Sequence, residues 1–310
     1  LPSEKILKLE ALMAVTLEEV AEMAGVSRST VSRVINDHPS VHADSRERVW
    51  QAIRESGYRP HAIARSLATS RTQIIGMVIP EAVSTIFADP YFSLLLRGAT
   101  KACDAHHYQM MLSLFDDFAT SQDEVYQQVI RGGYLDGLIV ASASLTNPLI
   151  PSLLEGSIPF VSVGRHPNPR VNYVEVDNVH GARLAVEHLI ELGHKRIATI
   201  TGRSNTPHGQ RRLEGYKQAL RAHQISSDDA LIVEGDFTEA SGATGMQKLL
   251  DASPTAVFAA SDMMAIAALK TILQAGRKVP RDVALVGFDD IPADSAIDPP
   301  LTMVRQPIRQ

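Results

Sequence analysis

The chain has 310 residues, of which 45% are hydrophobic and 21% charged, and its formal net charge is −5. This length allows two or three domains, and the composition is that of an ordinary globular protein. The single Cys103 excludes an intramolecular disulfide framework and a cysteine-based metal cluster, so we expect a cytoplasmic protein. Because no apolar run reaches the ~18 residues of a membrane-spanning helix, we expect no membrane partner.

The first residues carry no recognisable signal. The apolar stretch before Met13 is too short for a secretory signal and is mixed with charges. Met13 looks like a natural start, because a capped helical segment follows it. We therefore interpret residues 1–12 as an upstream extension or a cloning remnant and begin the first domain, 13–59, at Met13.

The segment TLEEVAEMAGVSRSTVSRVIND, residues 16–37, has the pattern of two short helices joined by a tight turn. Thr16 can cap the first helix, Gly25 supplies the turn, and Ser27 can cap the second helix. The second helix has an aliphatic face with i, i+3, i+4 spacing, formed by Val31, Val34 and Ile35. This arrangement is typical of a helix-turn-helix, whose second helix enters the DNA major groove.

The exposed face of that second helix is basic. Between Val26 and Arg71, eight arginines outnumber four acidic residues, although the whole chain is acidic. Arg28 and Ser29 lie at the leading end, where an arginine can bind guanine through two hydrogen bonds. The alternative is a solvated helix pair with no DNA partner. The DNA-binding candidates of this domain are Thr16, Ser27, Arg28, Ser29, Thr30, Ser32, Arg33, Asn36 and Tyr58.

A third helix is predicted within HADSRERVWQAIRESGY, residues 42–58. We expect Asp44 or Ser45 to cap it. Its inward face is expected to carry Val49, Trp50 and Ile53. Trp50, the single tryptophan of the chain, would then anchor a three-helix core.

From residue 73 to residue 310, apolar strand candidates alternate with amphipathic helices, which indicates parallel sheets covered on both faces. A proline-rich stretch, residues 164–177, interrupts the rhythm. We predict an α/β fold with two doubly wound lobes, about 73–163 and 164–300, and a cleft between the carboxyl ends of their strands. The strand candidates are 74–80, 108–115, 135–142, 159–164, 195–201, 231–235, 256–261 and 283–289.

No catalytic motif stands out in this region. We find no G-x-G-x-x-G after the first strand, no P-loop, no G-x-S-x-G elbow and no His-Glu metal helix, so we expect no enzyme, no cofactor and no metal. Asp289, Asp290, Asp294 and Asp298 are clustered and could form a cation site. Their spacing is loose, so we favour ordinary loop carboxylates.

Polar and aromatic residues at strand ends are better candidates for a ligand site. Arginines and carboxylates can hold neighbouring hydroxyl groups, while an aromatic ring stacks on the apolar face of a sugar. Each residue taken alone could equally be an ordinary surface or core residue. The effector-binding candidates are Tyr91, Phe92, Arg165, His208 in a strand-end loop, Arg212, Phe237, Ser261, Asp262 and Asp289.

The segments TLEEVAEMAGVSRSTVSRVIN and SGYRPHAIARSLATSRT resemble the lactose/galactose repressor family of bacterial transcription regulators. The likeness covers nearly all of the chain after Met13. It implies a core of two periplasmic-binding-protein-like lobes, and it supports Arg212, Phe237 and Asp289 as effector ligands. Family members often have Asn where this chain has Ser261, so we expect a different hydrogen-bonding pattern there.

The end of the chain also departs from the family pattern. Members of the family usually continue past LTMVRQPIRQ with one more helix and a strand. The sequence is therefore either truncated or different at this end. A truncation would leave the first lobe without a covering helix.

These observations favour an effector-controlled transcription regulator, expected to be a repressor, that binds operator double-stranded DNA as a homodimer. The expected effector is a small molecule, a sugar, bound between the lobes, and two recognition helices would lie ~34 Å apart on a near-palindromic operator. One alternative is a sugar-modifying enzyme with an appended DNA-binding module. Another is a free binding protein, for which the first domain has no use.

The segment PHAIARSLATSRT, residues 60–72, is the predicted hinge. Its helical spacing from His61 to Ala68 makes two turns, which is below the ~12–15 residues at which an isolated helix is stable. We predict that it is disordered without DNA and helical on the operator, with His61 and Arg65 at the DNA and Leu67 wedged into the minor groove. The resemblance implies the same role for Leu67. The alternative is that Leu67 caps the first strand.

We predict that Leu67→Ala lowers specific operator affinity, because the side chain that opens a base step is lost. The salt dependence of binding should stay nearly unchanged, since phosphate contacts set it. Anisotropy titrations of labelled operator across a range of salt concentrations measure both quantities. An operator affinity equal to that of the unmodified chain would rule the wedge out.

Overall fold

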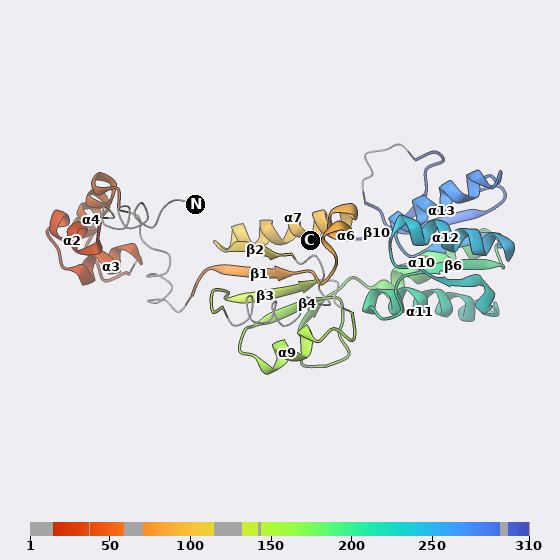
Figure 1. The fold of residues 1–310 in the computed structure, drawn as a ribbon, viewed down its shortest axis with the longest axis horizontal. Helices are drawn as coiled ribbons and strands as arrows, with labels where there is room; N and C mark the ends of the chain where they lie inside the picture. The colour runs from red at the N-terminus through yellow and green to blue at the C-terminus, as the bar shows by residue number, and fades with distance from the viewer. Residues whose placement is uncertain are drawn as a thin grey trace, which may run out of the picture. The chain divides into compact units, whose positions relative to one another are not determined.

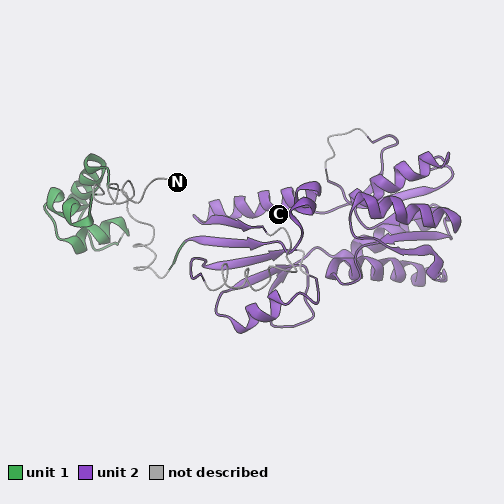
Figure 2. Ribbon diagram, viewed as in Figure 1, with its two compact units in different colours: residues 1–72 green, residues 73–310 purple. Residues whose placement is uncertain are grey.

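The structure is a computed structural model that describes residues 15–36, 38–58, 71–114, 132–141, 144–291 and 297–309 (Figure 1). It divides into two compact units, residues 1–72 and residues 73–310 (Figure 2). Most of the predicted hinge, with His61, Arg65 and Leu67, lies outside the described residues.

The first unit contains three helices: α2 (Leu17–Ala24), α3 (Arg28–Ile35) and α4 (Ala43–Ser56). The predicted caps of the first two helices are confirmed. Thr16 and Glu19 form a reciprocal capping box at α2, and the Ser27 side chain accepts from the Thr30 N–H at α3. Gly25 ends α2 with a φ of 62°, a left-handed conformation that glycine adopts without strain. The helix-turn-helix follows from these local signals.

The prediction that Trp50 anchors the three-helix core is wrong. Trp50 is 37% exposed, whereas Val49 and Ile53 are buried. Residues 49 and 53 are four apart and share the inner face of α4, so the residue next to Val49 lies about 100° around the helix. Tyr58, 8% exposed, fills the core instead. The predicted cap at Asp44 or Ser45 is also wrong, because α4 begins at Ala43 and its N-cap position is His42.

The second unit contains two lobes, each with a five-stranded sheet. In the first lobe, the order β2-β1-β3-β4-β5 joins Gln109–Ser113, Ile74–Val78, Gly137–Ala141, Phe160–Val163 and Tyr173–Val174. In the second lobe, the order β10-β9-β8-β6-β7 joins Thr302–Arg305, Ala284–Asp289, Ala256–Ala259, Ile197–Thr201 and Ile232–Glu234. All pairings between these strands are parallel.

Helices cover both faces of each sheet (Figure 1). In the first lobe, α7 (Pro90–Ala105) and α9 (Leu149–Glu155) lie on opposite sides, and the short α6 (Val83–Ala88) follows β1. In the second lobe, one core joins the sheet to α12 (Glu239–Asp251) and α13 (Asp262–Gln274). The other core joins it to α10 (Asn178–Glu191) and α11 (Pro207–Ala222). A 3-10 turn, Asp229–Leu231, precedes β7.

Neighbouring residues of the central strand β8 show why this sheet is apolar on both faces. Val257 points into the core under α12 and α13, whereas Phe258 points into the core under α10 and α11. Alternation of side chains across a sheet sends successive residues to opposite faces. Both faces are covered, so the strands of this sheet read as continuous apolar runs.

The two doubly wound parallel lobes are confirmed, and all eight strand candidates form strands, with shorter bounds.

Two further strands, β5 and β10, were not predicted. β5 lies within the stretch 164–177 and pairs with β4, so the first sheet extends past the expected lobe boundary at 164. β10 pairs with β9 and lies beyond residue 300, the expected end of the second lobe. A two-residue strand and a half-exposed edge strand carry too little apolar periodicity to be recognised.

Among the described helices, none is both long enough and apolar enough to cross a membrane.

Candidate functional site

A cavity of about 410 Å³ in the second unit is lined by residues of both lobes. One end is apolar, where Met77, Ile139 and Val161 of the first sheet meet Leu95 and Ala99 of α7. The other end is polar and lies where strands of both lobes finish. Its side chains are Glu81, Asp89, Tyr91, Asn178, Arg203, His208, Arg212, Asp236, Phe237, Ser261, Asp289 and Gln306.

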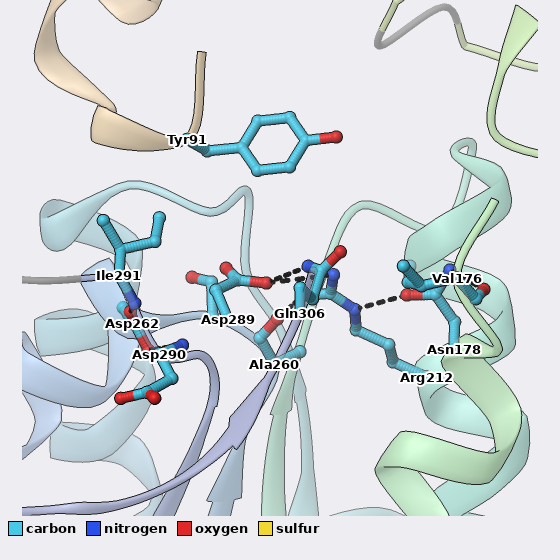
Figure 3. A network of polar contacts seen from close by, with 12 residues as sticks. Tyr91, Val176, Asn178, Arg212, Ala260, Asp262, Asp289, Asp290, Ile291 and Gln306 are labelled. Carbon is cyan, nitrogen blue, oxygen red and sulfur yellow. Dashed lines mark hydrogen bonds and ion pairs between the residues drawn. The ribbon is translucent and has the colours of Figure 1, made fainter. Parts of the chain in front are cut away.

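Arg212, on α11, is at the centre of the polar end and is 5% exposed (Figure 3). Its Nε donates to Asn178 Oδ1 at 2.9 Å, and its Nη1 donates to the Ala260 carbonyl. Its Nη2 lies 3.2 Å from Asp289 Oδ1. The guanidinium also stacks on Phe288, 3.8 Å from the ring centroid. A buried cation is stable only when its charge and its donors have partners, and these contacts provide them.

Asp289 ends β9 in a strained conformation. Its φ is 108°, which an L residue rarely adopts. Its carboxylate pairs with Arg212 and also accepts from the Gln306 amide. Burial raises the pKa of Asp289, while the neighbouring Arg212 opposes that rise. The strain is retained because the turn carries this carboxylate to the guanidinium.

Asp262 stabilises the turn that follows β9 and does not line the cavity. Its carboxylate oxygens accept the backbone N–H groups of Asp290 and Ile291, at 3.2 and 2.5 Å. Asp290 is itself left-handed, with a φ of 54°. Burial, with Asp289 nearby, raises the pKa of Asp262 to about 7. The structure therefore places Asp262 as a positioning residue for Asp289, where the sequence indicated a ligand contact.

Phe237 provides the aromatic surface of the polar end. It follows β7 with a φ of 72°, and its ring lies against the backbone of Gly202. A Cβ at residue 202 would come within 1.9 Å of Phe237 Cζ, so a side chain at that position would displace the ring. His208 packs beside it, with ring centroids 5.0 Å apart. Gly202 therefore determines where the ring can lie.

His208 lies in the first turn of α11, not in a strand-end loop as predicted. Burial, together with the positive charges of Arg212 and Arg203, lowers the pKa of His208 to about 3. The imidazole is therefore neutral near pH 7, with one nitrogen as donor and the other as acceptor.

The first lobe contributes Asp89 and Tyr91 at the start of α7. Asp89 caps the helix by accepting from the Tyr91 N–H at 2.9 Å. Burial raises the pKa of Asp89 to about 6 and that of Tyr91 to about 12. The Tyr91 ring faces the pair formed by Arg212 and Asp289 across the cavity (Figure 3).

An ion pair joins the two lobes at the polar end. Arg203 of the second lobe donates from Nη1 to both carboxylate oxygens of Glu81 in the first lobe, at 2.9 and 3.1 Å. A contact of this kind depends on how far the lobes are closed. It makes the polar end sensitive to lobe closure.

Seven of the nine effector-binding candidates line the cavity: Tyr91, Phe92, His208, Arg212, Phe237, Ser261 and Asp289. Phe92 is only 4% exposed and belongs mainly to the core of the first lobe. Asp262 and Arg165 are the two exceptions. Arg165 lies in a separate open groove, where its guanidinium is 5.5 Å from the Tyr173 ring centroid.

Sequence reasoning missed several residues that line the polar end. Glu81, Arg203 and Asp236 each follow a strand within a few residues, so the strand-end criterion could have found them. Gln306 follows the unpredicted β10, and Asn178 begins a helix, so neither gave that signal. In the described part of the chain, no group of three His, Cys, Asp or Glu residues could hold a metal ion.

Most of the DNA-binding candidates in the first unit are exposed or partly exposed. The Ser27 hydroxyl lies 2.8 Å from the hydroxyls of Ser29 and Thr30. Arg28 is exposed and pairs with Glu18 at 3.0 Å. The remaining candidates on the helices are Thr16 at the α2 cap, and Ser32, Arg33 and Asn36 along α3.

Two of these candidates have a further local feature. Asn36 ends α3, and its Oδ1 has no hydrogen-bond partner among the described residues. Tyr58 is mostly buried in the core, and its pKa is raised, by burial first and then by Glu18.

We predict that Asp289→Asn lowers the free energy of unfolding of the second unit by ~3–5 kcal/mol, because Arg212 keeps a buried charge without its carboxylate. Urea unfolding followed by circular dichroism measures this change. The double variant Arg212→Met/Asp289→Asn should lose less than the sum of the two single variants. As a control, Arg221→Met breaks an exposed pair with Glu214 and should cost only ~0–1 kcal/mol. Additive losses in the double variant would contradict a coupled pair.

Two family models match the chain. Residues 16–61 match the model described as bacterial regulatory proteins, lacI family, and residues 186–310 match the periplasmic binding protein-like domain. The first match covers the helix-turn-helix, and the second covers most of the second lobe.

Characterised proteins match over nearly the whole length. The HTH-type transcriptional regulator CelR of Thermobifida fusca is 42% identical over 302 residues, which is 94% of this chain and 87% of CelR. The catabolite control protein A of Priestia megaterium is 34% identical over 300 residues, 96% of this chain and 89% of that protein.

Solved structures agree with these matches. A CelR–cellobiose complex superposes with a TM-score of 0.73 at 39% identity, covering 95% of this chain and 89% of that one. The lac repressor dimer bound to operator and the anti-inducer ONPF gives a TM-score of 0.81 at 30% identity. The match covers 96% of this chain and 88% of the lac repressor chain. The chain belongs to the lacI family of bacterial regulatory proteins and is a DNA-binding transcriptional regulator, not an enzyme.

Proposed function

We propose that this protein is a cytoplasmic repressor whose affinity for its operator is controlled by a sugar bound between the two lobes. The observation that carries the proposal is the buried pair of Arg212 and Asp289 beside the Phe237 ring, at the polar end of a cavity that both lobes line. Arginine and carboxylate bind neighbouring hydroxyl groups, and the ring offers a stacking surface. The solved complex of one relative with cellobiose, and that of another with operator DNA, support it.

The sugar would act by changing how the lobes close. Arg212 and Asp289 belong to the second lobe, while Asp89 and Tyr91 belong to the first, so a ligand touching both favours one arrangement. A ligand shifts such an equilibrium only by its difference in affinity for the two states, typically ~1–3 kcal/mol per site. We propose that the shift reaches DNA through the hinge, residues 60–72, in a homodimer.

The DNA-binding domain, residues 13–59, would place α3 in the major groove. Arg28 and Ser29 at its first turn are exposed and would reach base edges. Other candidates lie along the same helix or at its caps and would contact phosphates or flanking bases. They are Ser27, Thr30, Ser32, Arg33 and Asn36. The effector-binding and dimerisation domain would then be residues 73–310.

The test begins with selection of an operator from duplexes with random palindromic half-sites. Fluorescence anisotropy then measures the affinity of the full chain for that operator, with and without a panel of monosaccharides and disaccharides. The proposal expects tight binding to the selected duplex and a change of at least about tenfold with one of the sugars. Failure to select any duplex at low salt would contradict DNA regulation. An operator affinity that no sugar changes would contradict sugar control alone.

We predict that Gly202→Ala weakens the effect of the sugar on operator affinity by at least about tenfold, because the new Cβ displaces the Phe237 ring from its stacking position. Operator affinity without sugar should be unchanged. Gly156→Ala is the matched control, since a Cβ there meets its nearest atom at an ordinary 3.6 Å. The same anisotropy titrations provide the measurement. An unchanged sugar response in Gly202→Ala would remove Phe237 from the proposed site.

A further inference from the structure

We propose that the effector is an uncharged sugar and that the cavity discriminates against sugar phosphates and sugar acids. This inference rests on the proposed function and specifies its ligand. It starts from the charges that line the cavity. Five carboxylates line it, from Glu81, Asp89, Glu175, Asp236 and Asp289, against three guanidinium groups, from Arg203, Arg212 and Arg309. The lining therefore has an acidic balance.

Both arginines at the polar end already have carboxylate partners. Arg203 donates to both oxygens of Glu81, and Arg212 pairs with Asp289 while its other nitrogens donate to Asn178 and Ala260. A phosphate that binds either arginine competes with the carboxylate already paired there. At Arg212 the displaced carboxylate would remain buried without a counter-charge, which is costly.

Arg309, the third arginine of the lining, is anchored by its backbone at the other end of the cavity. It is exposed, and its backbone packs against Gly98 of α7, with its carbonyl oxygen 3.2 Å from the position of a Cβ there. Gly98 belongs to the same helix as Leu95 and Ala99, which line the apolar end. The backbone of Arg309 therefore lies beside the apolar end.

Three helix N-termini at the cavity each already have one backbone N–H bound by a capping side chain. Free backbone N–H groups at a helix N-terminus are a common site for phosphate. Here the first turns of α7, α11 and α13 are capped by the side chains of Asp89, Thr206 and Ser261, and all three of these residues line the cavity. The cap at α7 is itself a carboxylate, so it repels an anion.

The polar end instead matches a ligand rich in hydroxyl groups. Its carboxylates come from both lobes, Glu81 and Asp89 from the first and Asp236 and Asp289 from the second. Hydroxyl groups can donate to carboxylates on both sides, and the neutral His208 adds one donor and one acceptor without charge. A phosphate or carboxylate group brings no donor and adds a like charge, and such a contact disfavours the wrong ligand.

The test uses matched pairs of probes. Cellobiose, maltose, lactose and trehalose are each compared with their 6-phosphates and, where one exists, with the corresponding aldonic acid. Isothermal titration calorimetry on the full chain gives the dissociation constants, and anisotropy gives the effect on the selected operator. We expect one uncharged disaccharide to bind and its phosphate to bind at least about 100-fold more weakly.

A matched pair of variants tests the cause of this preference. Asp89→Asn keeps a capping side chain on α7 and removes one negative charge from the cavity. It should reduce the preference for the uncharged sugar by at least about fivefold. Asp228→Asn is the control, since Asp228 caps the 3-10 turn Asp229–Leu231 and does not line the cavity. It should leave the preference unchanged.

Each outcome has a distinct meaning. A 6-phosphate or an aldonic acid that binds as tightly as its uncharged sugar, or more tightly, overturns the inference and leaves sugar control of the operator standing. Absence of binding by every probe, charged or uncharged, overturns the sugar proposal together with the inference. In that case operator binding would still identify a regulator. A preference that Asp89→Asn does not change would show that its charge is not the cause.

Discussion

The Arg212 guanidinium is buried, and the need to satisfy it organises the second unit of this protein. A cation this far from water requires a carboxylate and acceptors for its donors. Asp289, Asn178 and the Ala260 carbonyl meet that need, and Phe288 lies under the plane of the guanidinium. These partners come from β9, from α10 and from the chain just after β8. One side chain therefore ties together the strand ends that form the second lobe's side of the cavity.

That requirement also explains the strained backbone at the end of β9. Asp289 and Asp290 both have positive φ values, and neither is glycine. Asp262 stabilises the turn by accepting hydrogen bonds from two backbone N–H groups. These bonds compensate for the backbone strain at Asp289. A carboxylate held in this way is pre-organised for a ligand. Less binding energy is then spent on ordering the site.

The two lobes contribute differently to the polar end. The second lobe supplies the fixed centre, Arg212 with Asp289, and the Phe237 ring that lies against Gly202. The first lobe supplies Asp89 and Tyr91 at the N-terminus of α7. Its Glu81 also pairs with Arg203 of the second lobe. A ligand that donates hydrogen bonds to carboxylates of both lobes therefore binds in a way that depends on lobe closure. That is the property an effector-controlled regulator needs at this position.

The sequence predicted the parts of this arrangement that depend on local pattern. Caps at Thr16 and Ser27, the eight strands and the strand-end position of Asp289 follow from residue type and spacing. Features that depend on tertiary geometry were not predictable. Trp50 and Val49 are adjacent in sequence, and only the packing of α4 decides which of them is buried.

The same limit applies within the site. Asp262 and Arg165 satisfy the strand-end criterion, yet one supports a turn and the other lies in a separate groove. Gln306 depends on β10, whose pairing with β9 is long-range and whose residues are half exposed. A strand-end pattern therefore identifies candidates for a cleft. Which of them face it is decided by the turns that follow each strand.

The most direct test of this account is a crystal structure of the full chain grown with the sugar that changes operator affinity. We expect the sugar at the polar end, with hydroxyl oxygens within 3.2 Å of both Arg212 and Asp289, at least one hydroxyl bound to Asp89 or Glu81 of the first lobe, and one sugar face on the Phe237 ring. A sugar bound elsewhere, or one that touches the second lobe alone, would contradict the central role assigned to Arg212 and Asp289.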